Sequence, residues 1–223
     1  MVMNAQQTTD LTPEELRLPL LAAMDTHVPF DGWSDKALMS AAADVGISEP
    51  MAELAFPGGA LEALQMHLDA EDAALAEKLA TLDLPSMKIR DRITVAIRTR
   101  IEMNAHRREA VRRGLTMLAL PQHLPMGTKA LWNTADVMWR AAGDTSTDHN
   151  WYTKRATLSA VLSAVLLFWL NDESDDFEET WAFLDRRIED VMKIETAKFK
   201  MRGMSANIPS LSRFLGRLRY PGE

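Results

Sequence analysis

The chain has 223 residues, of which 47% are hydrophobic, so it is long and apolar enough to bury a full core. It contains no cysteine, which excludes disulfides, thiolate metal sites and cysteine nucleophiles. Its 25 basic and 32 acidic residues give a formal net charge of −7, which does not favour nucleic acid as a partner.

The first three predicted helices have the spacing of a helix-turn-helix. Thr12, Ser34 and Ser48 stand where N-cap residues are needed, and the segment 1–82 resembles the N-terminal part of TetR-type regulators. Residues 18–77, however, contain one basic side chain against eleven acidic ones, a net charge of −10. DNA affinity comes largely from basic side chains that neutralise phosphates. We therefore expect this part not to bind DNA.

Residues 83–202 are predicted to form the main helical domain. Two helices joined near Asn104 open it, and Asp148 caps a later helix that contains the apolar run at residues 156–170. This run is too short to span a membrane, so we interpret it as the central buried helix of a bundle. Ser174 and the two acids after it cap a last long helix. No strand-like alternation competes, and we expect an all-α fold of about nine or ten helices.

Positive charge gathers in one segment of this domain. Residues 87–113 carry nine basic and three acidic side chains, a net charge of +6. A solvated helix face and a surface for an anionic partner both fit this composition, and both interpretations stay open.

The histidines form no recognisable catalytic or metal-binding motif. None follows a Glu at the Glu-x-x-His spacing of di-iron bundles, and phosphate-loop, dinucleotide and nucleophile-elbow motifs are absent. Glu102 and His106, one helical turn apart, are more typical of a surface hydrogen bond than of a metal site. We expect neither an enzyme nor a bound cofactor or metal.

The C-terminal segment 203–223 has the pattern of an amphipathic helix that follows a short linker. Its apolar positions are Leu211, Phe214, Leu215 and Leu218, and its basic positions are Arg213, Arg217 and Arg219. An apolar face beside a cationic face suits a helix that lies in a membrane interface. A last helix docked on the domain or on a second subunit has the same period, and this alternative stays open.

The stretch 137–155 is rich in aromatic, polar and charged residues. Trp151 and Tyr152 are adjacent, and adjacent helical positions lie about 100° apart, so one of the two rings should be partly exposed. Exposed Trp, Tyr and Arg side chains together are typical of an interface.

Here a family resemblance emerges. The runs ALPQHLPMGTKALWNTADVMW, MWRAAGDTSTDHNWYTKRATLSAV and DDFEETWAFLDRRIEDVMKIE resemble the ubiquinone-biosynthesis accessory protein family, the ninth member of the coenzyme Q gene series. The resemblance covers roughly residues 92–200 and includes the irregular motif Gly-Asp-x-Ser-x-Asp-x-Asn-Trp-Tyr-x-x-Arg. It implies a TetR-like homodimer that has abandoned DNA, an apolar pocket for an isoprenoid lipid, a C-terminal membrane helix and a di-iron hydroxylase as partner.

The resemblance also implies where that partner binds. The corresponding residues are Asp148, Asn150, Trp151, Tyr152, Lys154 and Arg155. Lys154 stands where an Arg is also found, and a lysine cannot make the same bidentate contact.

Small residues among large ones on the central helix, together with flexible methionines before it, suggest a lining for the lipid. The candidates are Met117, Met126, Met138, Ala156, Ala160, Val161, Ala164, Val165, Phe168 and Trp169. For any single one of these residues, ordinary core packing is the better interpretation.

The first 30 residues contain one Arg and four acids, unlike a mitochondrial presequence. We therefore expect a cytoplasmic protein that lies peripherally at the inner face of a bacterial membrane. Its expected function is to bind an isoprenoid or quinone lipid and present it to a hydroxylase, without catalysis of its own. The alternatives are a TetR-like ligand-responsive regulator and an enzyme that acts on a lipid.

Overall fold

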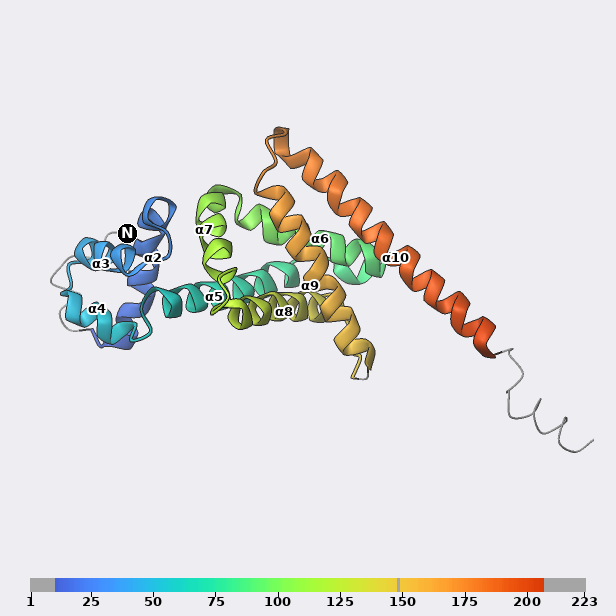
Figure 1. The fold of residues 1–223 in the computed structure, drawn as a ribbon, viewed down its shortest axis with the longest axis horizontal. Coiled ribbons are helices and arrows are strands. Elements are labelled where there is room, and N and C mark those ends of the chain that lie inside the picture. Colours follow the sequence, from blue (N-terminus) through green and yellow to red (C-terminus); the bar gives the residue numbers. More distant parts are fainter. Residues whose placement is uncertain (1–10, 148, 207–223) are drawn as a thin grey trace, which may run out of the picture.

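The computed structural model describes residues 11–147 and 149–206, which form nine α-helices and contain no strand (Figure 1). The helices are α2 Pro13–Asp31, α3 Asp35–Val45, α4 Glu49–Ala55, α5 Gly59–Ala80, α6 Ile89–Met103, α7 Arg108–Leu118, α8 Leu124–Ala141, α9 His149–Trp169 and α10 Glu178–Ala206. Short 3₁₀ turns lie at Leu84–Ser86, Ala105–Arg107 and Asp175–Phe177. The prediction of an all-α fold of nine or ten helices is confirmed.

Side-chain caps fix the first helices where the sequence predicts them. The Thr12 hydroxyl accepts a hydrogen bond from the Glu15 amide at 3.3 Å, and the Glu15 carboxylate accepts one from the Thr12 amide at 2.8 Å. Ser34 likewise accepts from the Ala37 amide at 3.2 Å and begins α3. These bonds satisfy amides that have no partner within their own helix. Ser48 begins α4 by its backbone alone.

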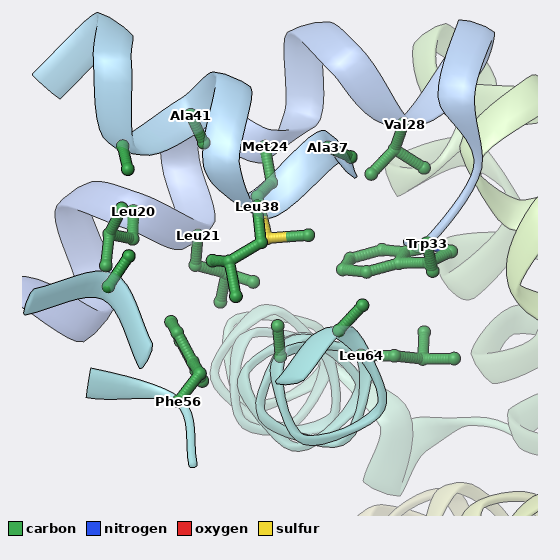
Figure 2. Close-up of a cluster of buried hydrophobic side chains, with 14 of the residues drawn as sticks. Leu20, Leu21, Met24, Val28, Trp33, Ala37, Leu38, Ala41, Phe56 and Leu64 are labelled. Atoms are coloured by element: carbon green, nitrogen blue, oxygen red, sulfur yellow. The ribbon is translucent and has the colours of Figure 1, made fainter. Parts of the chain in front are cut away.

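The N-terminal helices α2, α3 and α4 pack around one hydrophobic core at one end of the molecule (Figures 1 and 2). In Figure 2, Leu20, Met24 and Leu38 face inward between α2 and α3, and Phe56 and Leu64 close the core from the side of α5. This arrangement gives the helix-turn-helix part a core of its own.

A second core lies among α6, α8, α9 and α10, and α5 belongs to both cores. Ala60, Ala63 and Leu64 at the start of α5 are buried in the first core, whereas Leu75 and Leu79 are buried in the second. The two cores therefore divide within α5, whereas the sequence predicts a boundary at residue 82.

Arginines of the basic segment 87–113 donate hydrogen bonds to backbone carbonyls at the ends of other helices. Arg92 donates to three backbone carbonyls, including that of Ala142 at the end of α8 at 2.8 Å. Arg108 and Arg112 donate to backbone carbonyls at the end of α9. Cations near helix C-termini satisfy free carbonyls and complement the helix dipole. Much of this charge therefore has a structural use that neither interpretation of the sequence included.

The turn before α10 depends on Asp172 as well as on the expected Ser174. The Asp172 carboxylate accepts from the amides of Ser174 and Thr180, both at 2.8 Å. Burial alone would raise the pKa of Asp172, but hydrogen bonds from Ser174 and Thr180 outweigh it and lower the pKa to about 2. The ionised carboxylate thus ties the start of α10 to the end of α9.

Two sequence predictions fall on residues outside the described ranges, namely the cap Asp148 and the amphipathic segment Leu211–Leu218. Helix α10 continues through Gly203 to Ala206, where a linker was expected to begin. None of the described helices is both long and apolar enough to cross a bilayer.

Candidate functional site: a cavity between the two cores

A cavity of about 300 Å³ lies where the two cores meet. Helices α5, α6, α7, α8 and α9 all contribute to its wall. Leucines form most of its apolar lining: Leu64, Leu68, Leu115, Leu118, Leu124, Leu131, Leu162, Leu166 and Leu167. A volume of this size is at the lower end of those of small-molecule pockets and suits an apolar ligand.

One side of the cavity is polar. Five polar residues contribute to its lining: His67 and Glu71 of α5, Arg100 of α6, Asn104 directly after α6, and Thr134 of α8. Each of these five residues is at least nine-tenths buried. Buried polar groups need hydrogen-bond partners, so the contacts among them determine what this wall can bind.

Glu71 is the centre of the polar wall. Its carboxylate forms ion pairs with Arg100 at 2.8 Å and with Arg107 at 2.7 Å, and Arg107 in turn binds Asp25 of α2 at 2.7 Å. His67 lies 3.6 Å from Glu71. The network therefore connects the wall of the cavity with the N-terminal helices.

Burial shifts the pKa values of two titratable groups beside this network, His67 and Asp72. It lowers the pKa of His67, because an imidazolium loses hydration there, and the carboxylate of Glu71 opposes the shift only in part. It raises the pKa of Asp72, although the Thr134 hydroxyl donates to Asp72 at 2.7 Å and so opposes the change. Both shifts favour the neutral forms.

A second candidate site is a cluster of three aromatic rings where α8 meets the start of α9. The Trp151 ring centroid lies 5.5 Å from that of Trp132 and 4.8 Å from that of Tyr152. Tyr152 is 60% exposed, and the other two rings are half-buried. We call these three residues the aromatic surface. The expectation that one of the two adjacent rings is exposed agrees with this arrangement.

Arg155 is not part of any exposed surface in this structure. Its guanidinium is 2% exposed and binds Asp136 at 2.5 Å and Asp144 at 3.0 Å, and it lies 4.2 Å from the centroid of Trp151. Lys154 also binds Asp144, at 2.7 Å. Burial alone would raise the pKa of Asp144, but hydrogen bonds from Lys154, Ser146 and Arg155 outweigh it and hold the pKa well below the usual range.

The expected direct contact of Arg155 with a partner therefore needs correction. The side chain is buried because two aspartates and the Trp151 ring enclose it. It therefore contributes to the aromatic surface only by packing against Trp151. Asn150 and Tyr152 remain exposed among the residues assigned to the partner.

Comparison with known proteins gives a family match for part of the chain. Residues 124–195, which contain α8, α9 and the first part of α10, match the COQ9 family model. The chain carries a COQ9-family region. The resemblance predicted from the sequence is confirmed.

Curated COQ9 relatives match most of the chain. The ubiquinone biosynthesis protein COQ9 of Rattus norvegicus is 35% identical over 193 residues, which is 83% of this chain and 62% of the rat protein. The COQ9 protein of Homo sapiens is 33% identical over 192 residues, which is 83% of this chain and 60% of the human protein. The chain thus spans about three-fifths of the length of these relatives.

The names of these relatives contradict one prediction. The rat, human and Bos taurus COQ9 proteins are all described as mitochondrial. The prediction of a cytoplasmic protein at the inner face of a bacterial membrane is therefore wrong.

A solved structure agrees with the predicted fold class. The TetR transcriptional regulator from Nitrosomonas europaea superposes with a TM-score of 0.63 and 18% identity, over 78% of this chain and 96% of the regulator. At this identity the likeness shows the fold alone, and the prediction of a TetR-like fold is confirmed.

The residues predicted to line a lipid pocket do not line the cavity. None of the ten candidates is among the cavity-lining residues: Met117, Met126, Met138, Ala156, Ala160, Val161, Ala164, Val165, Phe168 and Trp169. Four of them, Met138, Val161, Val165 and Trp169, are buried in the second core, while Phe168 stacks on Phe183 of α10 with centroids 4.5 Å apart. The cavity instead uses the face of α9 that carries Leu162, Ser163, Leu166 and Leu167.

Trp132 and the polar wall were not predicted from the sequence. Trp132 precedes Trp151 by nineteen residues, and only the packing of α8 on α9 brings the two rings together. Among residues 11–147 and 149–206, no three His, Asp or Glu side chains gather closely enough to hold a metal ion.

Proposed function

We propose that this chain acts in ubiquinone biosynthesis by binding an isoprenoid or quinone lipid in the cavity between the two cores. The observation that carries the proposal is the leucine-lined cavity of about 300 Å³. Apolar area removed from water contributes roughly 25 cal/mol per Å², so such a lining favours a hydrocarbon ligand. The names of the COQ9 relatives support the pathway.

The role that we propose is non-enzymatic. The carboxylate of Glu71 in the wall of the cavity is bound by Arg100 and Arg107, so its charge is already matched within the protein. Turnover of a lipid by the purified protein alone would contradict this part of the proposal.

Mass spectrometry of a solvent extract tests lipid binding directly. The purified protein should release a prenylated quinone or another isoprenoid in near-stoichiometric amount. Ser163→Phe places a ring in the cavity and should abolish this lipid, whereas Ala160→Phe on the exposed face of α9 should leave it unchanged. If Ala160→Phe removed the lipid and Ser163→Phe did not, the lipid would occupy the face predicted from the sequence.

We also propose that the aromatic surface binds the partner hydroxylase. Large rings that are rigid and partly exposed carry much of the energy of protein interfaces. Tyr152→Ala should weaken a hydroxylase complex by about 2 kcal/mol without loss of helicity. Phe30→Ala is the matched control, because Phe30 is 83% exposed and lies on α2. Equal losses of affinity for the two substitutions would contradict the proposal that the aromatic surface is the binding site.

The proposal includes attachment to a membrane surface through the C-terminal amphipathic segment and assembly as a homodimer. Vesicle flotation with and without residues 208–223 tests the first point. Sedimentation equilibrium tests the second, with a monomer as the contradicting result.

A transcriptional regulator is the alternative that the TetR-like fold favours. Helix α4 stands in the position of a recognition helix, but it carries Glu49 and Glu53 and no basic residue. We therefore propose that it does not bind DNA, because phosphates would be repelled. Salt-dependent retention on DNA would reverse this conclusion.

A further inference from the structure

Two polar atoms in the wall of the cavity have no hydrogen-bond partner within the described part of the chain. They are Nη1 of Arg100 and Oδ1 of Asn104. Both residues line the cavity, and their exposed fractions are only 7% and 4%. A buried donor or acceptor without a partner is costly, so each of these atoms has affinity for a complementary ligand group.

The two side chains are held in place by their other atoms. Nη2 of Arg100 binds the Glu71 carboxylate at 2.8 Å, and Nδ2 of Asn104 donates to the Arg100 carbonyl at 3.0 Å. Arg100 and Asn104 are four residues apart at the end of α6, and such positions are neighbours on one helix face. The wall of the cavity therefore carries an unpaired donor and an unpaired acceptor on neighbouring residues.

The charge around this pair does not favour an anion. The guanidinium groups of Arg100 and Arg107 are already matched by the carboxylates of Glu71 and Asp25. Asp72 lies near them, and burial favours its neutral form, so it adds no positive charge; it accepts a hydrogen bond from Thr134. A ligand carboxylate or phosphate would meet no surplus of positive charge.

We propose that the cavity selects a neutral, hydroxyl-bearing amphiphile, in which one hydroxyl accepts from Arg100 Nη1 and donates to Asn104 Oδ1. A hydroxyl is the smallest group that is both donor and acceptor. The rest of the ligand lies against the leucines of α8 and α9, such as Leu131, Leu162 and Leu166. This inference rests on the proposed lipid-binding function and specifies the ligand class.

Calorimetric titration of the full chain with three matched probes tests the inference. The probes are para-hexylphenol, hexylbenzene and para-hexylbenzoate. Hexylbenzene is the most hydrophobic, so transfer from water alone would place it first. We expect the phenol to bind about tenfold more tightly than hexylbenzene, which reverses that order, and the benzoate to bind more weakly than the phenol.

Asn104→Leu should weaken phenol binding about fivefold and leave hexylbenzene binding unchanged. The matched control is Asn171→Leu, because the Asn171 amide donates to the Leu167 carbonyl four residues earlier, at 2.9 Å, and is exposed. This control should not change binding of either probe.

Hexylbenzene binding as tight as phenol binding in the unsubstituted chain would overturn the inference, whether or not the variants fold. Tightest binding of the benzoate would replace it with an anion site. If isoprenoid lipid is extracted but the probe order follows hydrophobicity, only this inference fails. If neither probes nor extracted lipid are found, the proposed function fails as well.

Discussion

Replacement of Arg155 by Met should destabilise the fold rather than merely remove a surface contact. The guanidinium is 2% exposed and forms ion pairs with Asp136 and Asp144, and Nη1 also donates to the Trp151 carbonyl at 3.2 Å. Removal of one partner from a buried ion pair costs about 3–5 kcal/mol, because the other charge stays buried. Lys154 continues to bind Asp144 at 2.7 Å, so we expect a loss near the lower end, about 3 kcal/mol.

Urea unfolding of Arg155→Met and of Arg140→Met provides the assay. Arg140 binds the same carboxylate, that of Asp136, at 2.7 Å, but its side chain is 73% exposed. An exposed pair contributes at most about 1 kcal/mol, so Arg140→Met should unfold close to the unsubstituted chain. Equal stabilities of the two variants would refute a structural role for Arg155 and return it to the partner-binding surface predicted from the sequence.

Two buried aspartates should respond oppositely to neutralisation. Asp172→Asn should cost about 2 kcal/mol at neutral pH, because the lowered pKa of Asp172 gives stability that is present above pH 4 and lost as the pH falls towards 2. Asp72→Asn should be neutral or stabilising at pH 7, because burial raises the pKa of Asp72 and the amide still accepts from Thr134; urea titrations at pH 3 and 7 check both variants, and equal losses would contradict the assignment. Gly143→Ala should cost about 1–2 kcal/mol in thermal unfolding, because φ is +86° there and a new Cβ would lie 3.3 Å from Arg92, and an unchanged melting temperature would show that this turn can relax.

Local chemistry made the helix boundaries predictable. Thr12 and Ser34 cap helices through bonds that span three residues, so the signal lies within a short stretch of sequence. The joint near Asn104 and the end of α3 at Gly46, where φ is +80°, follow the same logic. These helix ends depend on near neighbours in the chain, so the sequence predicts them.

The face of α9 that lines the cavity could not be predicted in this way. Residues 156–170 are apolar on all sides, so a period of 3.6 identifies no face. The regular spacing of Ala160 and Ala164 suggested a gap, but Ala160 is exposed and the cavity lies on the side of Ser163 and Leu167. Only the positions of α5, α7 and α8 decide which side is enclosed.

The partners of the charged residues were equally hidden. Arg155 lies nineteen residues from Asp136 and eleven from Asp144, and Arg107 lies 82 residues from Asp25. A charge count records that these groups exist but not which of them meet. The same limit applies to the pair of unpaired atoms on Arg100 and Asn104, whose significance depends on an enclosed space.

The hydrogen bonds from Arg108 and Arg112 to the end of α9 limit which fragments of the chain can fold alone. Helix α9 has no basic residue in its own last turn, and its final carbonyls are bound by Arg108 and Arg112, about sixty residues earlier. Both arginines lie before residue 124, outside the segment that matches the COQ9 family model. An excised fragment of that segment would lack its own C-terminal caps and three of the five helices around the cavity. We therefore expect the matched segment not to fold on its own, because the residues that precede it complete its structure.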